Sequence, residues 1–211
     1  MKILNSNSIA IVFDRLKEKF ENPKSELDFQ NNFELLCAVM LSAQTTDKAV
    51  NSVTPSLFKI APDAKTMSSL NTDVIENCIK RLGLYRNKAS NLIKMSNELV
   101  SRFDGMVPDN YDDLVSLPGV GSKTAKVVLN VGFKHNTLAV DTHIFRVCNR
   151  TGLCIGKTVK EVENNVVLKV PKEHLYNAHH YLLLHGRYVC TAKKPNCENC
   201  CINDICKKNL K

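Results

Sequence analysis

The sequence has 211 residues, a length that suits one large domain or two small ones and can bury a hydrophobic core without disulfide support. Its 44% hydrophobic and 24% charged residues are ordinary for a soluble globular protein, and no run of about 18 apolar residues could span a membrane. The net charge of +8 favours a polyanionic partner, most commonly nucleic acid, although a lysine-rich chain without a partner would carry the same charge.

The N-terminal segment is predicted to be an amphipathic helix and not a signal peptide. Apolar residues from Ile9 to Phe20 recur at helical spacing, while Asp14, Arg15 and Lys17 interrupt the apolar run soon after it begins. We therefore expect a cytoplasmic chain, whose thiols stay reduced.

Helical periodicity dominates the rest of the chain. Thr158 and Glu161 have the spacing of a capping box, and no sustained alternation of apolar and polar residues indicates a strand. The fold class is therefore predicted to be all-α with short loops. The expected helices lie within 33–44, from Thr46 through Val53 with a disturbance at Pro55, at 74–82, at 92–103, around 114–117, after the glycine turn to Gly132, at 142–150, through Val162 and Val166, and at 172–188.

Residues 117–125 read LPGVGSKTA and stand between two of these helices. Gly119 and Gly121 allow another backbone to approach closely, and the helix that follows presents unpaired N–H groups and the positive end of its dipole. Such a turn can bind a nucleic-acid phosphate without reading the base sequence. The segment 114–132 resembles the helix-hairpin-helix motif of DNA repair proteins; an αα-hairpin whose glycines only satisfy a tight turn is the alternative.

Lys123 stands in the first turn of the second of these helices. A cation there opposes the helix dipole, and a partly desolvated amine loses its proton readily, so Lys123 is a candidate nucleophile that forms a Schiff base. Contact with a phosphate is the alternative. Asp141 precedes the helix THIFRVCNR, where an aspartate acts as N-cap, yet the same carboxylate could manage protons and positive charge beside a catalytic amine.

Three segments together resemble one family of DNA repair enzymes. LPGVGSKTA, then VDTHIFRVCNR, then a terminal group of cysteines look like the endonuclease III family, the bifunctional branch of the helix-hairpin-helix DNA glycosylases. LLCAVMLSAQTTD at 35–47 resembles that family's early helix and the loop after it, so the resemblance covers nearly the whole chain. It implies that Lys123 attacks C1′ of the damaged nucleotide, that Asp141 is its acidic partner, and that β-elimination then cuts the strand 3′ to the lesion.

The resemblance also implies how damaged DNA is held. Gln44 matches the glutamine that fills the gap left by a flipped base, and Leu84 matches the wedge that contacts the opposite strand; a polar helix end and a packed loop residue are the respective alternatives. The nucleotide has to be extruded because attack on C1′ is blocked in the stack. Further contacts with DNA are expected along the hairpin, at Gly119, Val120, Gly121, Ser122 and Thr124.

Nine cysteines in a cytoplasmic chain argue against a disulfide framework. Cys190, Cys197, Cys200 and Cys206 have the spacing C-x6-C-x2-C-x5-C, which by itself allows zinc or an iron–sulfur cluster. The resemblance implies one [4Fe–4S] cluster per chain. Cys201 departs from the family pattern, so a register slip that would put Cys200 in doubt stays open. The remaining four cysteines are expected to lie in the core.

Lys193 and Lys194 lie on the loop between the first two of these cysteines. We interpret them as phosphate-binding residues on a loop that the cluster holds rigid, with a solvated basic loop as the alternative. The cluster is then structural and positions DNA, and it is not needed to break the glycosidic bond.

The expected architecture is two helical lobes with a DNA cleft between them. Residues 25–135 would form a helical-barrel domain that carries the hairpin, and residues 1–24 with 136–211 an iron–sulfur cluster domain. The predicted function is excision of oxidised pyrimidines such as thymine glycol, by a monomer that binds duplex DNA with damaged bases or abasic sites, associates with the nucleoid and avoids membranes. The alternatives are a monofunctional adenine glycosylase, which would lack the lysine, a non-catalytic iron–sulfur protein that binds DNA, and a zinc module.

Overall fold

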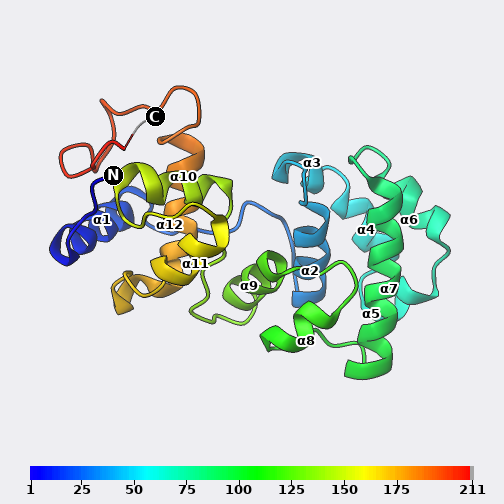
Figure 1. Cartoon of the computed structure of the whole chain (residues 1–211). Coiled ribbons are helices and arrows are strands. Elements are labelled where there is room, and N and C mark those ends of the chain that lie inside the picture. Colours follow the sequence, from blue (N-terminus) through cyan, green and yellow to red (C-terminus); the bar gives the residue numbers. More distant parts are fainter. Residues whose placement is uncertain (210–211) are drawn as a thin grey trace. The chain divides into compact units, whose positions relative to one another are not determined.

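The computed structural model describes residues 1–209, and every regular element in that range is a helix (Figure 1). The prediction of an all-α fold is therefore confirmed. Contacts divide the chain into two compact units: unit 1 comprises Met1–Lys24 with His135–Lys211, and unit 2 comprises Ser25–Lys134. Among the described helices, none combines the length and the apolar character that crossing a membrane requires.

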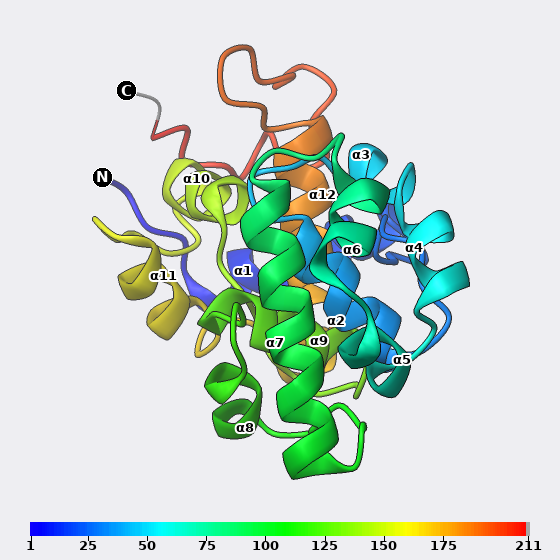
Figure 2. The ribbon, with the colours of Figure 1, turned by 90° about the vertical axis from the view of Figure 1, so that its right-hand side faces the viewer.

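Unit 2 is built around α2 (Asn32–Leu41), whose residues from Phe33 to Leu41 are all buried. A helix that is apolar nearly all round belongs in the centre of a core. The longest helix of the unit, α7 (Tyr85–Phe103), packs against α2 and can be followed along its length in Figure 2. The other helices of unit 2 are α3 (Asp47–Asn51), α4 (Thr54–Ile60), α5 (Ala64–Ser69), α6 (Thr72–Ile79), α8 (Tyr111–Ser116) and α9 (Ser122–Val131).

Unit 1 joins the beginning of the chain to its later part. In it, α1 (Ser6–Lys19) packs against α12 (Leu175–Tyr188), and α12 also packs against α10 (Thr142–Thr151). The backbone N–H of Leu4 donates to the carbonyl of Gly152 at 2.8 Å. A short helix, α11 (Val159–Val166), and a 3₁₀ turn (Lys172–His174) complete the helices of the unit, and a loop that contains the terminal cysteines follows α12.

The capping residues predicted from the sequence start their helices, with one difference in detail. The side chain of Thr46 accepts the N–H of Ala49 at the start of α3, as expected. In the predicted capping box, Thr158 accepts the N–H of Glu161, but the Glu161 carboxylate accepts the N–H of Lys157 at 2.8 Å instead of that of Thr158.

The helices between Thr46 and Ser69 differ from the expected pattern for local reasons. The helix that begins after Thr46 ends at Asn51, and α4 starts beside Pro55, because proline is tolerated in the first turn of a helix and not in its interior. The short helix α5 has the sequence AKTMSS, which shows no apolar periodicity, so the sequence did not indicate it. Asp63 caps it by accepting the N–H of Thr66 at 2.7 Å.

Candidate functional site

The turn between α8 and α9 requires glycine at one of its two glycine positions. Gly119 has a φ of +79°, and a Cβ on it would lie 2.9 Å from both Cβ of Asn91 and Cε of Met40. Gly121 has a φ of −92°, and a Cβ added there would meet nothing within 4 Å. Backbone conformation and close packing therefore explain Gly119, whereas Gly121 leaves open space at the start of α9.

The N-terminus of α9 has no side-chain cap, since Gly121 occupies the N-cap position. Its first N–H groups can therefore serve a ligand that carries negative charge. Ser122 is exposed and Thr124 is half-buried beside this end. Val120 is only 6% exposed and packs into the core of unit 2, so a DNA contact at this position would have to use its backbone.

The side chain of Lys123 is exposed. Lys123 therefore lies at the surface of unit 2, beside the first N–H groups of α9.

Gln44, Leu84 and Gly119 line one pocket of unit 2, although they come from three separate segments of the sequence. Gln44 and Leu84 have φ values of +54° and +59°, a left-handed backbone that is uncommon and strained outside glycine. Leu84 is 59% exposed, so the alternative of a packed loop residue is wrong. Gln44 is exposed in the turn beyond the end of α2. The pocket is completed by Met40, Leu41, Ala43, Asn87, Lys88 and Asn91.

Asp141 caps α10 in unit 1. Its Oδ1 atom accepts the backbone N–H groups of His143 and Ile144, each at 2.9 Å. The two hydrogen bonds hold the carboxylate in one orientation, and the residue is half-buried. The N-cap role that the sequence predicted is therefore present, and a chemical role for the same carboxylate stays a prediction.

The four cysteines predicted as ligands, Cys190, Cys197, Cys200 and Cys206, are half-buried and line one pocket of unit 1. Cys201 is also half-buried but is not part of that lining. These positions favour the register in which Cys200 is the ligand.

Elsewhere in the chain, Cys37, Cys148 and Cys154 are buried, as expected for core residues, and Cys78 is half-buried. Burial raises the pKa of the Cys148 thiol far above its ordinary value, which keeps that thiol neutral and inert.

The donor set of the cysteine pocket fits an iron–sulfur cluster, because four cysteines and no carboxylate line it. Within residues 1–209, no group of three or more His, Cys, Asp or Glu side chains is arranged to hold one metal ion. A zinc site needs its ligands to converge at about 2.3 Å from one point, whereas the thiolates of a four-iron cluster would each bind a separate iron and so lie farther apart. Burial raises the pKa of the Cys200 thiol to about 11, so iron has to displace a proton there on binding.

Two arginines of α10 hold the start of the cysteine loop. Arg146 donates to the carbonyl of Cys190 at 2.9 Å, and Arg150 donates to the carbonyls of Thr191 and Ala192 at 2.6 and 2.7 Å. Charge-assisted bonds of this kind are among the stronger hydrogen bonds of a protein. The sequence alone does not distinguish these arginines, because charged residues one turn apart are usual on any solvated helix face.

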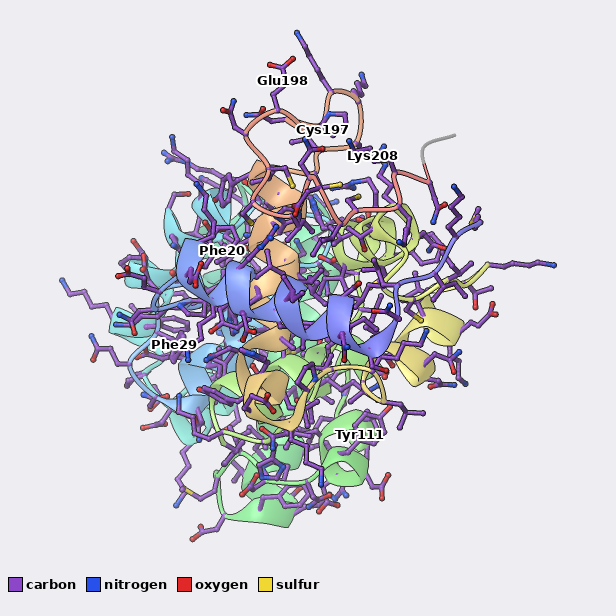
Figure 3. All side chains as sticks on the ribbon, turned by 90° about the vertical axis from the view of Figure 1, so that its left-hand side faces the viewer. Phe20, Phe29, Tyr111, Cys197, Glu198 and Lys208 are labelled. Atoms are coloured by element: carbon purple, nitrogen blue, oxygen red, sulfur yellow. The ribbon has the colours of Figure 1, made fainter. Side chains whose placement is uncertain are left out.

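The lysines of the same loop are presented to solvent. Lys193 and Lys194 are both exposed, and the hydroxyl of Thr191 donates to the carbonyl of Lys194 at 2.7 Å. Figure 3 labels Cys197 and Glu198 farther along the loop, which extends beyond the end of α12. The loop is therefore anchored at its base and carries its positive charge at the surface.

Comparison with known proteins places the chain in a family. Residues 37–172 match the model for HhH-GPD superfamily base excision DNA repair proteins, and residues 190–206 match the iron–sulfur binding domain of endonuclease III. Endonuclease III of Haemophilus influenzae is 47% identical over 204 residues, which is 97% of this chain and 97% of that protein. Endonuclease III of Escherichia coli (strain K12) is 47% identical over 196 residues, or 93% of each chain.

Solved structures also show the similarity to endonuclease III. A trapped covalent intermediate of endonuclease III with DNA superposes with a TM-score of 0.92 at 40% identity and covers 98% of this chain and 97% of that one. A thermostable thymine-DNA glycosylase, 21% identical with a TM-score of 0.80, shares the fold. The chain therefore belongs to the HhH-GPD superfamily of base excision DNA repair proteins, as an enzyme of the endonuclease III family that carries a [4Fe–4S] cluster.

Proposed function

We propose that this chain removes oxidised pyrimidines from duplex DNA and cuts the strand at the resulting abasic site, through a Schiff base on Lys123. The observation that carries the proposal is the exposed amine of Lys123 in the first turn of α9, directly after the glycine turn. The helix end can bind a backbone phosphate, so an amine beside it is well placed to reach a nearby sugar. The covalent complex of a similar endonuclease III with DNA supports the same class of chemistry here.

The proposed reaction begins when the neutral amine of Lys123 attacks C1′. The glycosidic bond breaks, and the damaged base leaves with the bonding electron pair. Loss of a proton from nitrogen and opening of the sugar ring give the Schiff base. Removal of a proton from C2′ then expels the 3′ phosphate, and water hydrolyses the Schiff base to regenerate the amine.

We assign to Asp141 the stabilisation of charge and the proton transfers that these reaction steps need. Its carboxylate stabilises the positive charge that develops on the sugar, and it exchanges protons with the reacting groups. The two backbone hydrogen bonds of the N-cap support this assignment, because they fix the carboxylate before substrate arrives.

We assign the contacts with DNA to residues of both units, and each assignment rests on a separate observation. Gln44 fills the gap left by the extruded nucleotide and Leu84 wedges against the opposite strand; their exposure at left-handed turns supports these roles. The hairpin from Gly119 to Thr124 binds a backbone phosphate. Lys193 and Lys194 add electrostatic contacts. We further propose that the protein acts on chromosomal DNA and that it works as a monomer. Size-exclusion chromatography with light scattering can test the monomeric state.

The cluster supplies, when bound, a rigid four-point attachment for the cysteine loop, with Cys190, Cys197, Cys200 and Cys206 as its ligands. Their shared pocket supports this ligand set. Arg146 holds the first of these cysteines through its backbone carbonyl. The residues of the chain therefore shape and orient the basic loop, while bond cleavage is left to the amine and the carboxylate.

The decisive experiment is borohydride trapping on a duplex with one thymine glycol, which reduces a Schiff base to a stable covalent adduct. We expect an adduct with the native protein and none with Lys123→Gln. Lys126→Gln is the matched control, because Lys126 lies on the same helix within one turn. Its variant should form the adduct as the native protein does.

Other outcomes would select the alternatives. Base release without an adduct in the native protein would indicate a monofunctional glycosylase. Tight binding with neither base release nor an adduct would indicate a non-catalytic DNA-binding protein. An adduct that persists in Lys123→Gln would mean that another amine is the nucleophile.

A further inference from the structure

The pocket that contains Gln44 also contains a buried lysine, Lys88, on α7. Its Nζ atom donates to Oγ1 of Thr45 at 2.6 Å. The hydroxyl of Thr45 in turn donates to the carbonyl of Ala43 at 3.3 Å. The chain of hydrogen bonds therefore contacts the residues on both sides of Gln44, whose backbone is left-handed.

The positive charge of Lys88 destabilises the folded protein, because the amine is buried. The residue is only 8% exposed, and burial lowers the pKa of its amine. No described carboxylate forms an ion pair with it, and it stands in the first turn of α7, where the helix dipole disfavours a cation. An uncompensated buried charge destabilises a fold, so stability does not explain its presence.

Lys88 also connects the second left-handed residue to this network. Its backbone N–H donates to the carbonyl of Leu84 at 3.0 Å, which is the first hydrogen bond of α7 after Leu84. The backbone of Lys88 is therefore tied to Leu84, and its side chain is tied to the turn at Gln44. Both turns border the same pocket.

We propose that Lys88 is a positioning residue that holds Gln44 in the left-handed conformation from which it enters the gap in the DNA. The hydrogen bond to Thr45 fixes the turn before DNA binds, so the strain at Gln44 is not relieved by rearrangement in the free protein. This inference rests on the proposed role of Gln44.

Three variants separate the contribution of the Lys88 charge from that of the Thr45 hydroxyl. Lys88→Met removes the charge and the hydrogen bond while it keeps the length and apolar stem of the side chain. Thr45→Val removes the hydroxyl at nearly constant shape, and Thr45→Ser restores it. We expect Lys88→Met to unfold at or above the native temperature, because a buried charge is lost. Thermal unfolding and the visible absorption of the cluster check that each variant is intact.

The readout is the affinity for two duplexes, one intact and one with a tetrahydrofuran abasic-site analogue. We expect Lys88→Met and Thr45→Val each to weaken binding to the abasic duplex by roughly tenfold, the effect of one hydrogen bond to a charged group. Binding to the intact duplex, which has no gap to fill, should be unchanged. Thr45→Ser should bind like the native protein, and Lys88→Met should cause no further loss in a Gln44→Ala background.

Three results would overturn the proposal. Native affinity of Lys88→Met for the abasic duplex would show that the turn does not need this contact. Equal weakening on both duplexes, with a shallower dependence on salt, would show that Lys88 contacts phosphate directly. Additive losses in the double variant would show that Lys88 acts independently of Gln44. Native affinity of Gln44→Ala itself would instead refute the proposed role of Gln44, so the two failures can be told apart.

Discussion

The Oδ1 atom of Asp141 accepts the backbone N–H of Ile144 at 2.9 Å, so this carboxylate caps α10 whatever else it does. Asparagine caps helices about as well as aspartate but lacks the charge. We expect Asp141→Asn to keep the native unfolding temperature and to lose about 100-fold or more of single-turnover base release. Asp141→Ala, the control, should lose the activity and also about 1 kcal/mol of stability. Full activity of Asp141→Asn would remove the carboxylate from the chemistry.

The two glycines of the hairpin should respond differently to the same added methyl group. Gly119→Ala forces a left-handed conformation on alanine and places its Cβ against Asn91 and Met40, so we expect a loss of about 2 kcal/mol or more in the free energy of unfolding. Gly121→Ala meets open space and should cost less than about 1 kcal/mol, since alanine is only a poorer N-cap. Urea unfolding measures both.

The affinity for DNA gives a second test of the hairpin, in the Gly121→Ala variant. The methyl group of Gly121→Ala would stand where a phosphate is proposed to approach α9, so this stable variant should bind duplex DNA more weakly. If its affinity were native, the phosphate would not approach on that side of the turn.

Leu84 should matter for extrusion and not for stability. Because the side chain is exposed, Leu84→Ala should change the free energy of unfolding by no more than about 0.5 kcal/mol. We expect slower release of thymine glycol from duplex DNA but native cleavage of a preformed abasic site, where no base has to be extruded. Gel assays on the two substrates distinguish the steps, and equal loss on both would argue against a wedge.

Neighbouring cysteines provide a matched test of the ligand register. Cys200→Ser should reduce the iron content well below the native value of about four per chain, because an oxygen replaces a thiolate ligand. Cys201→Ser should keep the native iron content, since Cys201 does not line the pocket of the other four. Iron analysis and visible absorption of the freshly purified proteins decide between them. The reverse result would establish the slipped register.

Features that depend on local sequence could be predicted, and features that depend on tertiary neighbours could not. The caps at Thr46 and Asp141 follow from residue type and the helix that comes next, so the pattern alone indicated them. Lys88 could not be distinguished from the other lysines of the chain, because its burial and its contact with Thr45, a residue 43 positions away, exist only in the folded unit. Arg146 was unrecognised for the same reason: its partner Cys190 lies 44 positions along the chain.

The packing of α1 against α12 has a consequence for the order of assembly in the cell. Unit 2 is one uninterrupted stretch of chain, whereas unit 1 joins two stretches, because α1 is synthesised before unit 2 and its partner α12 after it. At ordinary translation rates α1 waits on the order of ten seconds for α12, with apolar residues such as Phe13 open to chaperones or aggregation. Iron can be inserted only after Cys206 has emerged. Shortage of iron would therefore act on a part of the chain that is made after the hairpin has had time to form.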